Sequence, residues 1–146
     1  MSKKVIKYIP VCIIVVILLN MLFPTYYQRE RKYYADRDNF ITVTATVADI
    51  TYYEESNQVC IQVTDKSISF TDTGFIIRGE SLDRIVQNGF AEKIQIGNEI
   101  TFVCAPRYFG DGYKIPIVAL SAGDEQVLGF EEGYANLLSD YGIKER

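Results

Sequence analysis

The sequence predicts a mainly β domain, a small antiparallel barrel with one internal short helix and a C-terminal helix, behind one N-terminal transmembrane helix. Three observations lead to this fold class. An uncharged run over residues 8–27 concentrates apolar residues near the N-terminus. From Ile41 onward, apolar and polar residues alternate in short segments, which is typical of half-buried strands. Apolar residues with helical spacing occur twice, at 82–86 and at 130–138.

The N-terminal run is predicted to be a transmembrane signal anchor over residues 8–27. Residues 1–7 are then a cytoplasmic tail and residues 28–38 a juxtamembrane linker. The centre, Val11 to Phe23, is almost wholly aliphatic, and a helix needs about 20 apolar residues to cross the hydrocarbon core. A cleaved signal peptide is the alternative. The run is longer than the roughly 7–15 residues usual for a cleaved signal, and no pair of small residues follows it.

The orientation of this span follows from the charges that flank it. Three lysines precede the run: Lys3, Lys4 and Lys7. Four basic residues follow it, Arg29, Arg31, Lys32 and Arg37, so the number of positive charges on the two sides is nearly equal. The leading lysines lie closer to the apolar run, and a short tail before one span is typical of a signal anchor. The sequence therefore predicts a single-pass membrane protein whose C-terminal domain lies outside the cytoplasm.

Two features of this region suggest contacts. Asn20 is the one strongly polar residue within the apolar run, so it marks either a contact with another transmembrane helix or solvation at the membrane surface. Four tyrosines follow the run and fit an aromatic belt at the membrane interface, with a docking surface as the alternative. These tyrosines are Tyr26, Tyr27, Tyr33 and Tyr34.

Residues 39–146 form the predicted barrel domain. The expected strands lie at 41–50, 59–64, 75–78, 99–105 (after a turn at Gly97-Asn98) and 115–120, and residues 127–128 can extend the sheet. The alternation breaks near Asp49, which indicates a bulge or bend. Pro116 implies an edge or a bulge, because proline donates no backbone hydrogen bond.

Two helices accompany these strands. The first is expected to begin with Ser81 as its N-cap, to place Leu82, Ile85 and Val86 on one face, and to stop at Asn88-Gly89. In the second, four apolar residues fall on one face of a C-terminal amphipathic helix. These residues are Phe130, Tyr134, Leu137 and Leu138.

Three segments resemble parts of an OB-fold, the small barrel that has a helix between its third and fourth strands. ITVTATVADI resembles the long, bent first strand, GESLDRIVQNG the intervening helix, and IGNEITFV the glycine-turn entry to the fourth strand. The resemblance covers residues 41–128. A different small α+β meander or a lipocalin-like half-barrel is the alternative.

The OB-like reading implies a binding face flanked by two loops, the first hairpin loop and the loop between strands four and five. Aromatic rings beside hydrogen-bonding groups suit sugar rings or peptides. The alternative is that these side chains only cover the ends of the barrel. The candidate ligand- or partner-binding residues are Tyr52, Tyr53 and Glu54 in the first loop, and Arg107, Tyr108, Phe109 and Tyr113 in the second.

Composition excludes several functions. The chain has no histidine, which removes His-based metal sites and imidazole proton shuttles. The acidic pairs Glu54-Glu55 and Glu131-Glu132 are neighbours in sequence, whereas glycoside hydrolysis needs two carboxyl groups that face each other. Residues 39–146 hold 8 Lys and Arg against 16 Asp and Glu, a net charge of −8, so nucleic acid is not an expected partner. We expect no catalytic residue, no metal site and no cofactor.

The cysteines of the barrel give a further expectation. Alternation places Cys60 on the same strand face as Gln62, and Cys104 on the same face as Ile100 and Phe102. Bridged side chains must point at each other, so this pattern argues against a disulfide between Cys60 and Cys104.

Together these features predict a single-pass, membrane-anchored, non-enzymatic binding protein with an extracytoplasmic OB-like domain. Its expected partners are the lipid bilayer and a protein of the cell envelope. One alternative is a structural or regulatory accessory subunit that acts through its transmembrane helix. A second alternative is an envelope enzyme.

Overall fold

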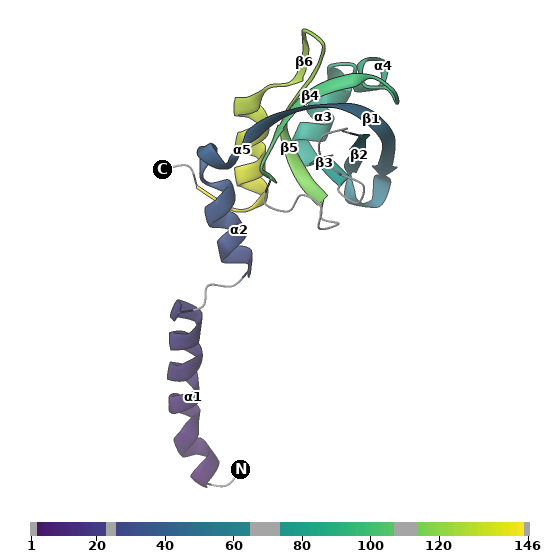
Figure 1. Ribbon diagram of the computed structural model, residues 1–146. Helices are drawn as coiled ribbons and strands as arrows, with labels where there is room; N and C mark the ends of the chain where they lie inside the picture. Colours follow the sequence, from purple (N-terminus) through teal and green to yellow (C-terminus); the bar gives the residue numbers. More distant parts are fainter. Residues whose placement is uncertain (1–2, 23–25, 65–73, 107–113, 145–146) are drawn as a thin grey trace. The chain divides into compact units, whose positions relative to one another are not determined.

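The computed structural model describes residues 3–22, 26–64, 74–106 and 114–144 (Figure 1). The chain forms two compact units, Met1–Tyr33 and Tyr34–Arg146.

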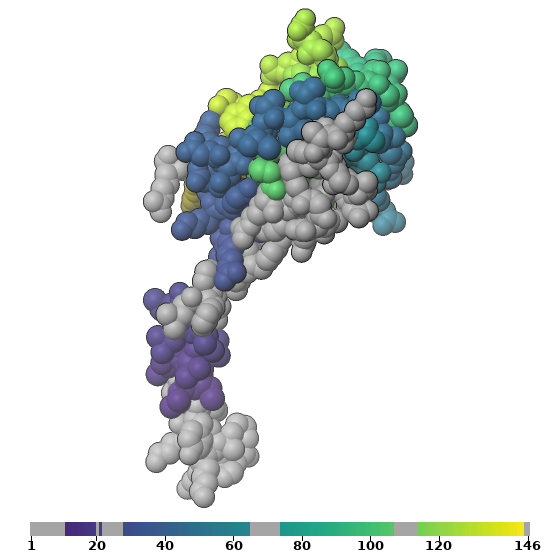
Figure 2. All heavy atoms as spheres, in the orientation of Figure 1, coloured from purple at the N-terminus to yellow at the C-terminus, as the bar shows by residue number. Residues whose placement is uncertain are grey.

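The first unit holds α1 (Lys3–Leu22) and nearly all of α2 (Tyr26–Tyr34), so a helix occupies much of the predicted linker. The aliphatic side chains from Val11 to Leu19 are 47% to 57% exposed on α1 (Figure 2). Side chains of α1 are described only for residues 11–19 and 21, and within the part of the chain so described no helix is long and apolar enough to cross a membrane.

The second unit is mainly β, with a closed five-stranded barrel and accompanying helices. The barrel strands are β1 (Ile41–Tyr53), β2 (Gln58–Thr64), β3 (Gly74–Arg78), β4 (Glu99–Cys104) and β5 (Lys114–Ala122), and β6 (Glu125–Leu128) pairs with β5 outside the ring. β1 pairs with both β2 and β4, and β3 pairs with β5 to close the ring. This arrangement is compatible with an OB-like barrel.

One strand pair differs from the antiparallel barrel that the sequence predicts, because β3 and β5 run parallel. The reason is geometric. Four successive antiparallel pairings lead from β3 through β2, β1 and β4 to β5, so the first and last strands point the same way. A closed ring with an odd number of strands therefore contains at least one parallel pair.

The predicted bulge in β1 is confirmed. Val47 pairs with Val63 and Asp49 pairs with Gln62, which leaves Ala48 as the extra residue. The bulge bends β1, so that its first half pairs with β4 and its second half with β2 (Figure 1).

The helix between β3 and β4 begins earlier than predicted. α3 (Gly79–Gln87) has Arg78 at its N-cap position, and Ser81 lies buried inside the helix. The Ser81 hydroxyl instead accepts a hydrogen bond of 3.0 Å from the Asn136 side chain, so the expectation of a Ser81 N-cap is wrong. The predicted stop is confirmed, because Gly89 takes the left-handed conformation at φ +80° before the short helix α4 (Phe90–Lys93).

The interior of the barrel is apolar and contains a pair of aromatic rings in tilted contact. Phe75 and Phe102 lie with ring centroids 4.6 Å apart. Cys104 lies fully buried in this core, whereas Cys60 is buried outside the core cluster, opposite Ile76 of β3. Both thiols are free, as the alternation predicted.

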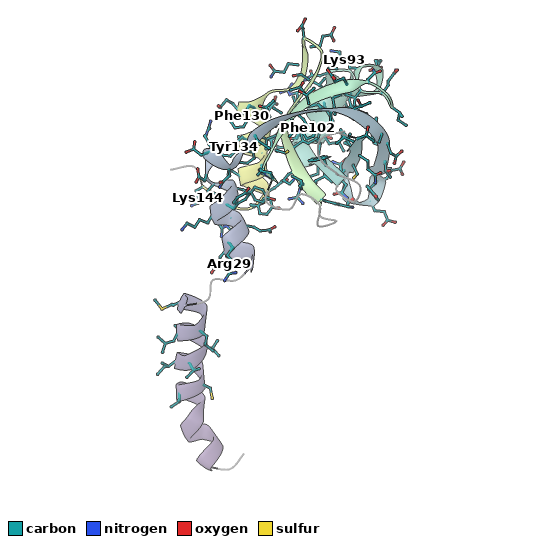
Figure 3. The ribbon with its side chains drawn as sticks, in the orientation of Figure 1. Arg29, Lys93, Phe102, Phe130, Tyr134 and Lys144 are labelled. Atoms are coloured by element: carbon teal, nitrogen blue, oxygen red, sulfur yellow. The ribbon has the colours of Figure 1, made fainter. Side chains whose placement is uncertain are left out.

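The C-terminal helix α5 (Phe130–Asp140) packs on the outside of the barrel against β5. Tyr134, Leu137 and Leu138 are buried as the spacing predicted, and Phe130 is half-buried. Figure 3 labels Phe130 and Tyr134 on this helix. Gly133 lies against the backbone of Val118 in β5, closer than any side chain would allow.

An aromatic cluster attaches the start of the second unit to α5. The Tyr34 ring lies 4.9 Å from Tyr141, and the Phe40 ring lies 5.4 Å from Tyr134 in an edge-to-face arrangement. Arg37 covers this cluster, with its guanidinium 4.6 Å from the Tyr134 ring centre. Tyr34 is only 2% exposed, so its predicted place in a membrane-interface belt is wrong for this residue.

Candidate functional site

The first hairpin and α3 face each other across a pocket. β1 ends at Tyr53, the chain makes a 3-10 turn (Glu54–Ser56), and Asn57 takes the left-handed conformation at φ +44° before β2 begins. Asparagine tolerates this conformation better than most residues. The backbone N–H of Gly79 donates to the Asn57 carbonyl at 3.2 Å, which fixes the tip of the hairpin to the start of α3.

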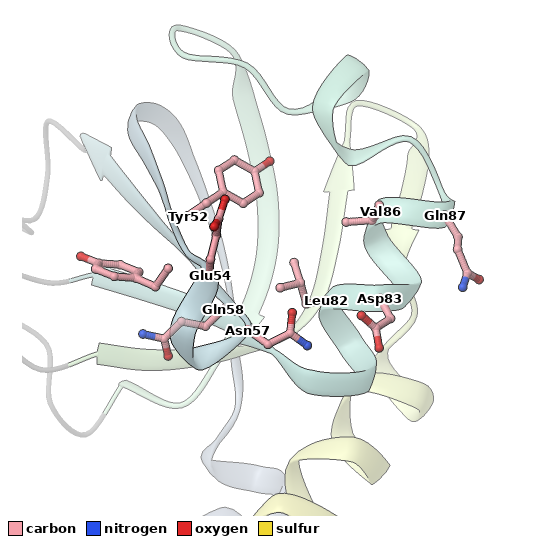
Figure 4. Close-up of a pocket in the computed structure, with 9 residues that line it drawn as sticks. Tyr52, Glu54, Asn57, Gln58, Leu82, Asp83, Val86 and Gln87 are labelled. Atoms are coloured by element: carbon pink, nitrogen blue, oxygen red, sulfur yellow. The ribbon is translucent and has the colours of Figure 1, made fainter.

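The pocket has a volume of about 510 Å³, within the range of small-molecule and side-chain binding sites. Hairpin residues form one side and α3 residues the other (Figure 4). The lining residues are Tyr52, Tyr53, Glu54, Asn57, Gln58, Leu82, Asp83, Val86 and Gln87.

The two tyrosines of the hairpin have different neighbours. Tyr52 is 53% exposed and meets Phe90 edge-to-face, with ring centroids 6.2 Å apart. Burial raises the pKa of the Tyr52 hydroxyl above its ordinary value of 10.0, so at neutral pH it is a protonated hydrogen-bond donor. The ring of Tyr53 carries the Lys114 ammonium group, whose Nζ lies 4.3 Å from the ring centroid.

The α3 side of the pocket is apolar at its centre. Leu82 and Val86 point from the helix toward the hairpin, whereas Gln87 points away from it (Figure 4). Val86 is 59% exposed, so the prediction that it shares the packed face with Leu82 and Ile85 is wrong for this residue. This exposed valine and the tyrosine rings give the pocket its apolar surface.

Two carboxylates complete the pocket. Glu54 stands on the hairpin and Asp83 on α3. None of the nine lining residues is a lysine or an arginine. The two carboxylates give the lining itself a negative charge, in a domain that is acidic, and the Lys114 ammonium group lies beside it on the Tyr53 ring.

The other reactive groups of the barrel are held in unreactive form. Burial raises the pKa of the Cys104 thiol to about 12, and burial also raises that of Cys60. A thiol with so high a pKa is not a nucleophile at neutral pH. Among the residues that the structure describes, no group of three or more acidic or cysteine side chains is placed to hold a metal ion.

The structure brings together only part of the predicted site. Tyr52, Tyr53 and Glu54 lie in one pocket. The predicted residues of the second loop, Arg107, Tyr108, Phe109 and Tyr113, lie outside the described residues, as does the side chain of Asn20. The contact of Tyr53 with Lys114 places the first hairpin beside the start of β5.

The α3 wall was missed by the sequence prediction. Leu82 and Val86 were assigned to the buried face of the helix because they fall at helical spacing with Ile85. Spacing predicts which residues share a face but not how much of that face is covered. The tyrosines of the first hairpin predict a binding loop, but they do not predict that α3 lies across from it.

Comparisons with models of known protein families and with curated proteins find no match for this chain. The class of protein therefore rests on the fold and the pocket, which define a closed five-stranded β-barrel with a concave site between its first hairpin and its internal helix.

Proposed function

We propose that this chain is a membrane-anchored, non-enzymatic binding protein whose OB-like barrel holds a partner in the pocket between the first hairpin and α3. The pocket itself carries the proposal. It is concave, it exposes an aromatic ring and a valine, and it holds a few polar groups that can orient a ligand. Exposed apolar groups in a concave surface are typical of binding sites.

The sequence supports the anchor. Residues 8–27 contain no charge, and 20 residues in a continuous helix extend over about 30 Å, the thickness of a hydrocarbon core. The lysines next to the run favour a cytoplasmic N-terminus and an extracytoplasmic barrel.

A non-enzymatic role is supported by the chemistry of the side chains. The chain lacks histidine, and the high pKa of Cys104 keeps that thiol protonated. Acid–base and nucleophilic catalysis both need a titratable group activated by a positioned neighbour.

Site-specific photo-crosslinking of the full-length chain in its own membranes tests the pocket. A benzoylphenylalanine is placed at Val86, at Tyr52, or at the control position Asp124, which is exposed and outside the pocket. We expect a discrete crosslinked adduct from the two pocket positions and none from the control. Adducts of equal yield at all three positions, or none at any, would refute the pocket.

The anchor has its own test. We expect the wild-type chain to stay in the membrane pellet after alkaline carbonate extraction, and Ile14→Arg with Ile17→Arg to release it, since each arginine costs about 2.5–3.5 kcal/mol at the centre of a span. Release of the wild-type chain would refute anchoring. A reporter fused after Arg146 tests the orientation, and reporter activity in the cytoplasm would reverse it.

The accessory-subunit alternative makes a different prediction in the same cells. If the transmembrane helix carries the interaction, Asn20→Leu abolishes co-purification of the partner while Tyr52→Ala leaves it intact. The opposite result favours the pocket.

A further inference from the structure

We propose that the pocket takes a basic side chain, the ammonium or guanidinium group of a lysine or arginine on a protein partner. The inference rests on the proposed function and names the chemistry of the partner. Four observations support it. The walls of the pocket carry two carboxylates, neither carboxylate is in an ion pair, an apolar surface lies between the walls, and the same hairpin already binds a lysine of its own chain.

Charge is the first observation. Glu54 and Asp83 line the pocket from its two sides, and its remaining polar residues are neutral amides and tyrosines. The whole domain from residue 39 to 146 holds 8 basic against 16 acidic residues, a net charge of −8. A field of one sign that meets a concave surface attracts a ligand of the opposite charge and repels an acidic one.

The pairing of these carboxylates is the second observation. Some acidic residues of the domain form ion pairs with its own cations: Glu125 with Lys93, Glu131 with Arg37, Glu132 with Arg84, and Asp140 with Arg78. In the part of the chain that the structure describes, neither Glu54 nor Asp83 is in an ion pair. Their charge is therefore available to a ligand.

The apolar path is the third observation. Lysine and arginine carry three or four methylene groups below the charge, and these groups need an apolar surface when the side chain is bound. Val86, which is 59% exposed, offers most of that surface on α3, and the largely buried Leu82 adds to the wall opposite the ring of Tyr52 (Figure 4). A neutral sugar would use the ring, but it would leave two carboxylates without a counter-charge.

A cation on the neighbouring tyrosine is the fourth observation. Lys114 places its Nζ 4.3 Å from the centroid of the Tyr53 ring, within the range of a cation–π contact. The hairpin thus already holds one ammonium group from its own chain. Tyr52, the preceding residue, presents a ring that is 53% exposed, and an exposed tyrosine ring is a surface on which a cation can bind.

The experiment measures binding of a fluorescein-labelled peptide with alternating leucine and lysine to the full chain in non-ionic detergent, by fluorescence anisotropy. The same peptide with every lysine ε-acetylated keeps the methylene stem and lacks the charge. We expect the lysine peptide to bind, and the acetylated peptide to bind about tenfold more weakly, which is the effect of two partly exposed ion pairs. Equal binding of the two peptides, or no binding of the lysine peptide, overturns the inference.

Matched variants localise the effect. Glu54→Gln with Asp83→Asn should weaken binding of the lysine peptide about tenfold. Glu99→Gln with Asp124→Asn changes the net charge equally at exposed positions outside the pocket, and should bind the peptide as wild type does. An equal loss in both double variants would mean that only the overall charge of the domain attracts the peptide, and overturns the site.

Two outcomes separate this inference from the proposed function. If photo-crosslinking at Val86 persists while the lysine peptide fails to bind, the pocket binds a partner through other chemistry, and only the inference fails. Maltohexaose serves as the neutral glycan probe, and its binding with loss in Tyr52→Ala but not in Glu54→Gln would identify a sugar site instead. If neither crosslinks nor peptide binding occur, both proposals fail.

Discussion

Gly133 provides a test of how closely the C-terminal helix packs on the barrel. It is the fourth residue of α5, where its missing side chain lets the helix approach the backbone of β5. A Cβ atom at this position would lie 2.1 Å from the Val118 carbonyl oxygen and 3.1 Å from the Leu128 side chain. The obstructing oxygen belongs to a central strand, so it cannot swing aside as a flexible side chain could.

Two effects of Gly133→Ala oppose each other. Alanine favours a helix over glycine by about 1 kcal/mol. Against this, a carbon and an oxygen that do not bond prefer to stay about 3.3 Å apart, so α5 would have to withdraw by about 1 Å. Overpacking of this kind costs about 1–3 kcal/mol, and here it also loosens Tyr134, Leu137 and Leu138. We expect the steric effect to win and the variant to be less stable by up to about 2 kcal/mol.

Urea unfolding of the full chain in non-ionic detergent, followed by circular dichroism, measures the difference. Ala135→Gly is the control, because Ala135 is exposed on the same helix and loses only helix propensity, about 1 kcal/mol. If Gly133→Ala instead raised the free energy of unfolding by the propensity gain, α5 would not be packed against β5 at this distance, and the reasoning would be wrong.

Three further changes probe the same unit by unfolding or labelling. The hydrogen bond from Arg37 lowers the pKa of Glu131 below its ordinary 4.5, so the pair stabilises the fold above pH 4.5 and loses that contribution as the pH falls through the lowered pKa. The stability difference between wild type and Glu131→Gln should therefore shrink in acid, and a difference that grew would contradict the pair. Cys104, with a pKa of about 12, should resist iodoacetamide at neutral pH until urea unfolds the chain, as read by peptide mass spectrometry. Tyr134→Phe removes the hydroxyl that donates to the Ala35 carbonyl at 3.0 Å, and urea unfolding should show a loss of about 1 kcal/mol.

Local signals in the sequence predicted most of the barrel. Alternation identified the strands because a half-buried strand repeats every two residues, and the break near Asp49 became the bulge at Ala48. Gly89 was identified as a helix stop because a left-handed residue is needed there, and the structure gives it φ +80°. Each of these features is decided by neighbours within a few positions along the chain.

Features decided by distant residues were missed. Ser81 is a good N-cap by type, but Asn136, 55 positions away, binds its hydroxyl inside the helix. The burial of Tyr34 depends on Tyr141 at the other end of the domain. A tyrosine beside a predicted span fits a membrane belt equally well, until tertiary structure supplies another place for its ring.

The pocket shows how a site can follow from strand register. β2 and β3 pair with Gln58 opposite Arg78, so the residues just outside this pair, Asn57 and Gly79, must also lie side by side. Their hydrogen bond of 3.2 Å confirms this, and α3 begins at Gly79. The register of β2 against β3 therefore places the start of α3 at the tip of the first hairpin. Alternation predicts the two strands but not their register, which is why the tyrosine side of the pocket could be predicted and the valine side could not.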